Sequence, residues 1–115
     1  MHRIYNVPLA EVYPLYLKKI ERKGRSEAEL VQVICWLSQI TESQLKQYCE
    51  NNTSFRDFFA QTEIHQDASK ITGSICGVKI AEIDDPLMKK IRYLDKVVDE
   101  LSKGKSLEKI FRSEH

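Results

Sequence analysis

The chain has 115 residues, of which 42% are hydrophobic, and its formal net charge is only +1. This length is short for two domains but sufficient for one core, so we predict a single helical domain over residues 1–115. No segment approaches the about 18 apolar residues of a membrane span, and the low net charge argues against a surface built for nucleic acid.

The cysteines and the charge pattern narrow the class of protein further. Cys35, Cys49 and Cys76 are an odd number without the spacing of a disulfide framework or a zinc site, which favours a reducing, cytoplasmic environment. Basic ends, residues 1–25 and 86–115, flank an acidic middle. Either these charges complement one another across the fold, or a basic face meets an anionic partner.

The first predicted helix lies between Pro8 and Gly24. Gly24 is a natural C-terminal stop. One apolar stripe at helical spacing is predicted from Leu9, Tyr13, Tyr16, Leu17 and Ile20. Pro14 lacks the N–H that would bond to the carbonyl of Ala10, and its ring clashes with that turn. The helix therefore either begins near Pro14 or is kinked there.

Two capping boxes predict the next two helices. Ser26 and Glu29 form the first box, which opens a helix over about 27–40. This helix is apolar over more than half of its circumference, so we expect it to be central in the domain. Thr41 and Gln44 repeat the box and open a shorter helix.

The next stretch changes from helical to irregular. Ser54 caps a short helical segment that carries three phenylalanines. From Thr62 to Ile83, two glycines and partial alternation of apolar residues replace the helical spacing. We predict an irregular insert or a minor β-hairpin near residues 70–82.

The clearest helical pattern follows this insert. Asp84 or Asp85 caps it, Pro86 occupies its first position, and apolar residues keep spacings of three and four until Gly104. Its charged residues, Asp99 among them, are predicted on the far, solvent-facing side. A last short helix begins after Ser106. The fold class is therefore all-α, a small bundle of five or six helices with a minor insert.

Four residues are candidate binding positions: Cys76, His65, Arg92 and Asp95. Cys76 lies in the glycine-bearing stretch, where a thiol can be accessible, and a nucleophile there would need a base such as His65. Arg92 is a candidate anion contact. Asp95 lies at the edge of the apolar stripe and is expected to pair with Arg92. The alternative for Cys76 is an inert structural thiol.

No residue pattern indicates a catalytic centre, a metal or another cofactor. His2, His65 and His115 have none of the spacings that metal sites use, and the two glycines beside Cys76 do not form a phosphate-binding motif. The basic run from Lys18 to Arg25 can bind phosphates, or it is an ordinary solvated helix face.

Several ordered strings closely resemble a bacterial family called domain of unknown function 2200. The resemblance covers almost the whole chain and implies a compact, mostly helical bacterial protein. It implies no activity, cofactor or catalytic residue. The strings are Arg3-Ile4-Tyr5, Val12-Tyr13-Pro14-Leu15-Tyr16, Glu21-Arg22-Lys23-Gly24-Arg25, Trp36-Leu37, Ile71-Thr72-Gly73, Cys76-Gly77-Val78, Asp85-Pro86-Leu87-Met88 and Ile91-Arg92-Tyr93-Leu94-Asp95-Lys96.

The sequence has many helix caps and apolar helix faces but no catalytic cluster, and this combination leads to one main functional prediction. We expect a non-enzymatic helical interaction or regulatory module of a bacterial cytoplasm, binding a protein partner or forming a homodimer, with no membrane association. The alternatives are a small enzyme or ligand-binding protein that uses the loop around Cys76, and a weak nucleic-acid binder that uses the basic ends.

Overall fold

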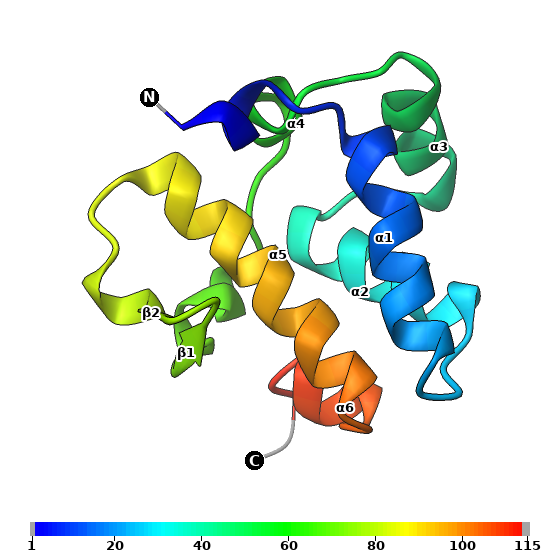
Figure 1. Cartoon of the computed structure of the whole chain (residues 1–115), viewed down its shortest axis with the longest axis vertical. Helices are drawn as coiled ribbons and strands as arrows, with labels where there is room; N and C mark the ends of the chain where they lie inside the picture. The colour runs from blue at the N-terminus through cyan, green and yellow to red at the C-terminus, as the bar shows by residue number, and fades with distance from the viewer. Residues whose placement is uncertain (1, 114–115) are drawn as a thin grey trace.

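The computed structural model describes residues 2–113, which form six α-helices, three short 3₁₀ helices and one two-stranded hairpin (Figure 1). This confirms the predicted all-α class. No helix in this range has the length and apolar character needed to cross a membrane. The elements are η1 (Arg3–Asn6), α1 (Leu9–Glu21), α2 (Glu27–Ser38), α3 (Glu42–Glu50), α4 (Phe55–Gln61), η2 (Gln66–Lys70), β1 (Ser74–Ile75), β2 (Val78–Lys79), η3 (Ile80–Glu82), α5 (Pro86–Ser102) and α6 (Leu107–Ile110).

Helix α5 lies across the middle of the molecule and contacts α1, α2, α4, α6 and the hairpin (Figure 1). Its apolar stripe supplies several fully buried side chains, as the spacing predicts. Helix α2, predicted to be central, packs against α1, α3, α5 and α6. The core is therefore built around two long helices. The buried stripe of α5 includes Ile91, Leu94, Val97, Val98 and Leu101.

The predicted helix caps are all present. Ser26 and Thr41 each accept a bond from the backbone N–H three residues on, and both capping boxes are complete. Ser54 and Ser106 cap α4 and α6 in the same way, and Asp85 caps α5. Each cap satisfies backbone donors that the first turn of a helix leaves unpaired, which explains why these local signals fix the helix starts.

Helix α1 begins at Leu9 and continues through Pro14, so the predicted alternative of a start near Pro14 is wrong. The Leu9 N–H donates to the carbonyl of Thr53 at 2.8 Å, which holds the first turn against the segment before α4. At the other end Gly24 has a φ of +79°, as the predicted stop requires.

The insert contains a minimal hairpin, which confirms the prediction for residues 70–82. Cys76 and Gly77 form its two-residue turn, with φ values of +54° and +76°. Two consecutive positive φ values are typical of a type I′ turn, and a cysteine is uncommon in that conformation. The Lys96 ammonium donates to the carbonyl of Ser74 at 3.1 Å and ties the hairpin to α5.

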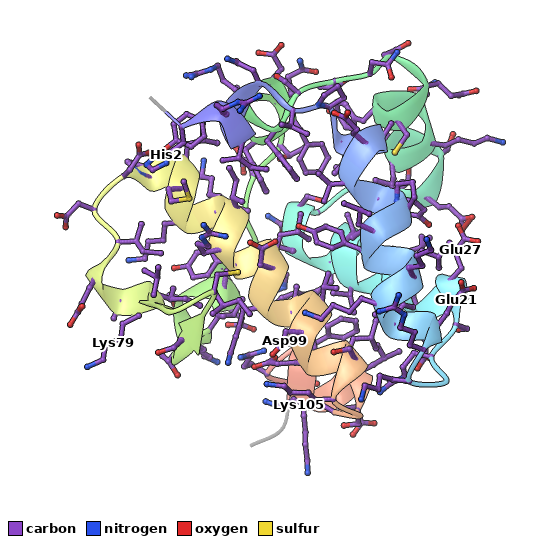
Figure 2. The ribbon with its side chains drawn as sticks, in the orientation of Figure 1. His2, Glu21, Glu27, Lys79, Asp99 and Lys105 are labelled. Carbon is purple, nitrogen blue, oxygen red and sulfur yellow. The ribbon has the colours of Figure 1, made fainter. Side chains whose placement is uncertain are left out.

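The C-terminal end of α5 differs from the prediction. Asp99, expected to face solvent, is only 9% exposed, because Lys19 of α1 and Lys103 contact its two carboxylate oxygens at 3.0 Å each. Figure 2 shows Asp99 at this end of the helix, with Lys105 close by. Within the basic N-terminal segment, Lys19 therefore neutralises an acid of the C-terminal helix, whereas Arg25 pairs with Glu29 of the middle segment.

Candidate functional site

Three of the four predicted positions lie near one another. The Arg92 guanidinium contacts Asp95 at 2.8 Å, which confirms their predicted pairing, and the Tyr16 hydroxyl donates to the other Asp95 oxygen at 2.6 Å. Burial raises the pKa of Tyr16 well above its usual value, the charge of Asp95 raises it further, and Cys76 contributes in the same direction. The Cys76 thiol is therefore within electrostatic reach of this cluster.

His65 lies in a different cluster. Its ring stacks on Trp36 at 4.8 Å, and its Nδ1 accepts from the Asp67 N–H at 3.0 Å. Phe111 stacks on Trp36 as well, at 5.2 Å. Within residues 2–113, no hydrogen bond joins His65 to Cys76, so the arrangement of a thiol with its base is not formed.

Metal ligands do not gather in the described part of the chain. Across residues 2–113, no group of three or more histidine, cysteine, aspartate or glutamate side chains is arranged to hold an ion. His115 lies outside the described residues. Two of the predicted positions, Arg92 and Asp95, therefore form a cluster with Tyr16, while His65 and the exposed Cys76 lie outside its hydrogen bonds.

An open groove of about 540 Å³ lies between α1, α2 and α3. Its floor is mainly apolar, and its rim carries two glutamates and one lysine. Figure 2 places Glu27, one of the rim residues, on the opposite side of the molecule from Lys79 of the hairpin. The lining residues are Tyr13, Glu27, Ala28, Val31, Glu42, Leu45, Lys46 and Cys49.

The local sequence explains how this lining is assembled. Glu27 and Glu42 each follow a capping residue directly, so each carboxylate stands at the first position of its helix, α2 or α3. Glu42, Lys46 and Cys49 recur at spacings of four and three, which places them on one face of α3. Tyr13 completes the wall from α1.

Electrostatics in the groove are dominated by its carboxylates. The Tyr13 hydroxyl donates to Glu27 at 2.7 Å. Burial raises the pKa of Tyr13, and the bond to Glu27 and the charge of Glu42 add to this rise. Burial also raises the pKa of Cys49, so its thiol is protonated at neutral pH and is a poor nucleophile.

The sequence alone did not reveal this groove. Tyr13 was predicted to belong to the core stripe, yet it is half-buried at the groove wall. The available signal was the second apolar flank of α2, formed by Val31 and Cys35, which exceeds what one core face requires. Placing Val31 beside Cys49 depends on how α3 turns back on α2.

These features define a small all-α protein with an apolar, acid-rimmed groove on one face. The chain belongs to the family described as "Uncharacterized protein conserved in bacteria (DUF2200)", whose model matches residues 3–112. The resemblance predicted from the sequence strings is thus confirmed. The fold is similar to the crystal structure of the uncharacterized protein SP1917, with a TM-score of 0.92 and 39% identity over 100% of this chain and 97% of that chain. None of the curated proteins matches this chain.

Proposed function

We propose that this protein is a non-enzymatic interaction module that receives a segment of another protein in the groove between α1, α2 and α3. The observation that carries the proposal is the combination of an apolar floor with a charged rim, which is the usual anatomy of a protein-binding surface. The half-buried side chains of Val31 and Cys49 supply apolar surface that a partner would cover.

The alternative of an enzyme built around Cys76 has less support. A thiol nucleophile requires a nearby base, and the contacts of His65 hold it against Trp36 instead. Arg92 pairs with Asp95, and Asp95 also accepts from Tyr16, so both carboxylate oxygens of Asp95 are occupied by groups of the fold. An anionic substrate would have to compete with Asp95 for the Arg92 guanidinium.

Site-specific photo-crosslinking in a bacterial cytoplasm tests the docking role. A photoreactive amino acid replaces Ala28, an exposed residue on the groove, in one variant and Ala60, an exposed residue of α4, in a matched control. We expect discrete adducts from position 28 that are absent from position 60. Equal labelling at both positions, or labelling at neither, would overturn the proposal. An adduct of twice the chain's mass would identify a second copy as the partner.

A further inference from the structure

The charged groups on the groove rim have no ion-pair partners. Within residues 2–113, Glu27, Glu42 and Lys46 form no ion pair, whereas Glu29, one turn along α2 from the rim, is held by Arg25 at 2.7 Å. Glu27 accepts a hydrogen bond from Tyr13, but neither it nor Glu42 has a cationic partner, so both carboxylates can pair with a cation of another protein without breaking an internal ion pair.

The negative charge of the rim reaches the groove interior. Glu42 and Glu27 both act on the Tyr13 phenol, and Glu42 also helps burial to raise the pKa of the Cys35 thiol. The apolar walls lower the local dielectric, so this field is screened less than it would be on a flat polar surface. A cationic group on a partner would therefore be favoured at this rim.

The two helices that form most of the groove are acidic, although the whole chain is slightly basic. Helices α2 and α3 together carry four glutamates, and Lys46 is their one basic residue. The long side of the groove is α3, whose nine residues extend for roughly 13 Å, about the length of two to three turns of a partner helix. Apolar residues spaced three and four apart would reach this floor together.

From the charge, shape and apolar floor of the groove, we infer that its ligand is a basic amphipathic helix of another protein. The inference rests on the proposed docking role. The apolar face of the helix covers Val31, Leu45 and Cys49, and its lysine or arginine side chains pair with Glu27 and Glu42. The same rim disfavours an acidic helix and a nucleic acid, because both would bring like charges together.

Titration with synthetic helical peptides tests this inference on the full chain. The probe is a peptide of about 14 residues, or four turns, with leucines on one face and lysines on the other. The matched probe carries glutamate at each lysine position. We expect the lysine peptide to bind at the groove, mapped by amide chemical shifts around Ala28 and Cys49, and to bind more weakly as salt screens the rim charges.

Reversal of one rim charge and removal of the other supply the decisive variants. Glu42→Lys should weaken binding of the lysine peptide about tenfold, and Glu27→Gln about threefold. The control Glu82→Lys makes the same charge change at an exposed residue of η3 and should alter binding less than about twofold. Both rim glutamates lie at helix N-termini, where loss of the negative charge weakens the interaction with the helix dipole, so circular dichroism is measured to check that each variant keeps its helices.

Failure of this inference can be told apart from failure of the docking role. Equal affinity for the glutamate peptide, or undiminished binding of the lysine peptide to the Glu42→Lys variant, would overturn the inference. Chemical shift changes confined to another surface would do the same. Adducts at position 28 that contain a partner segment without basic residues would also overturn it while leaving the docking role intact.

Discussion

Tyr16 joins α1 to α5 through a single hydroxyl group. This hydroxyl donates to Asp95 at 2.6 Å, and the side chain around it is buried. A hydrogen bond to a charged acceptor contributes more than a neutral one, because the lone pairs of the carboxylate are costly to leave unsatisfied. At the scale of one residue, this bond therefore carries a measurable part of the contact between two helices.

Replacement of Tyr16 by phenylalanine should lower the free energy of unfolding by about 1.5–3 kcal/mol. The measurement is urea unfolding at neutral pH. Tyr93→Phe is the matched control, because the Tyr93 hydroxyl has no hydrogen-bond partner within residues 2–113, and it should cost less than about 0.5 kcal/mol. Equal losses in the two variants would contradict the role given to the Tyr16–Asp95 bond.

The same tyrosine predicts a loss of stability at alkaline pH. Burial and Asp95 raise the pKa of folded Tyr16 above the value of about 10 expected in the unfolded chain. Its contribution is therefore complete below pH 10 and is lost as pH rises toward the folded pKa. Urea midpoints measured from pH 8 to pH 11 should fall less steeply in Tyr16→Phe than in the parent protein, although Tyr5 and Tyr13 add to the same trend.

The three cysteines should differ in their reactivity toward an aromatic disulfide reagent. Cys76 is exposed in the hairpin turn, whereas burial raises the pKa of both Cys35 and Cys49. Since the thiolate is the reacting species, we expect one fast thiol and two slow ones in the folded protein. Cys76→Ser should remove the fast phase and keep the slow ones, and a fast phase that survives this substitution would contradict the assignment.

At the scale of elements, Arg25 connects the loop after α1 to the end of α5. Its Nη1 atom donates to the carbonyls of Leu101 at 3.2 Å and Lys105 at 2.9 Å, and its other nitrogens bind Glu29. These carbonyls lie at the end of α5 and just beyond it, so the guanidinium holds the loop after α1 against the segment that leaves α5. The basic run around Arg25 therefore has a structural use.

Arg25→Lys should destabilise the protein by about 1–2 kcal/mol, because lysine keeps the charge but cannot contact Glu29 and two carbonyls together. Arg22→Lys makes the same exchange at an exposed position and should cost less than about 0.5 kcal/mol. Chemical denaturation of both variants measures the difference. A loss in Arg22→Lys as large as that in Arg25→Lys would contradict a specific role for the guanidinium.

Arg25→Lys should also change how the free energy of unfolding depends on pH in acid. Hydrogen bonding to Arg25 and to the Ser26 backbone lowers the pKa of Glu29 from 4.5 to about 2. The stability that this pair contributes is therefore present above pH 4.5 and is lost as pH falls toward 2. In Arg25→Lys the pKa of Glu29 should rise, so unfolding midpoints measured between pH 5 and pH 2 should depend less on pH.

Helix boundaries were largely predictable from the sequence because their causes are local. Ser26, Thr41 and Ser106 cap helices through bonds within three residues, and such contacts appear as short motifs. The start of α1 was not predictable in this way, since the bond from Leu9 to Thr53 joins residues far apart in the chain. The burial of Asp99 was missed for the same reason, because its partner Lys19 comes from another helix.

At the scale of the whole molecule, the candidate sites depended on packing that one sequence does not display. The Arg92–Asp95 pair was predictable, because residues three apart on a helix are neighbours. The third member of that cluster, Tyr16, lies 79 residues away in the chain. The groove is still harder to predict from the sequence, because it forms only where three helices, α1, α2 and α3, pack together.

Packing pairs several basic residues from the two ends of the sequence with carboxylates of α5. They converge at the C-terminal end of α5, where Lys19 and Lys103 pair with Asp99, and Arg112 and Lys105 pair with Glu100. Glu100 is only 6% exposed, so its partners are held against it. Much of the positive charge that the sequence suggests for a partner is therefore used within the fold.

This internal neutralisation predicts weak binding to polyanions. On a heparin column the protein should elute below about 200 mM salt, because Lys19, Lys103, Lys105 and Arg112 are held by carboxylates and do not displace the counterions of the polymer. Lys18→Glu combined with Lys23→Glu reverses two exposed bases near the end of α1 and should lower that elution only slightly. Retention beyond about 500 mM salt that this double variant abolishes would mean that the free lysines form an effective anion-binding face. In that case the basic end, rather than the acidic groove, would be the principal interaction surface of the molecule.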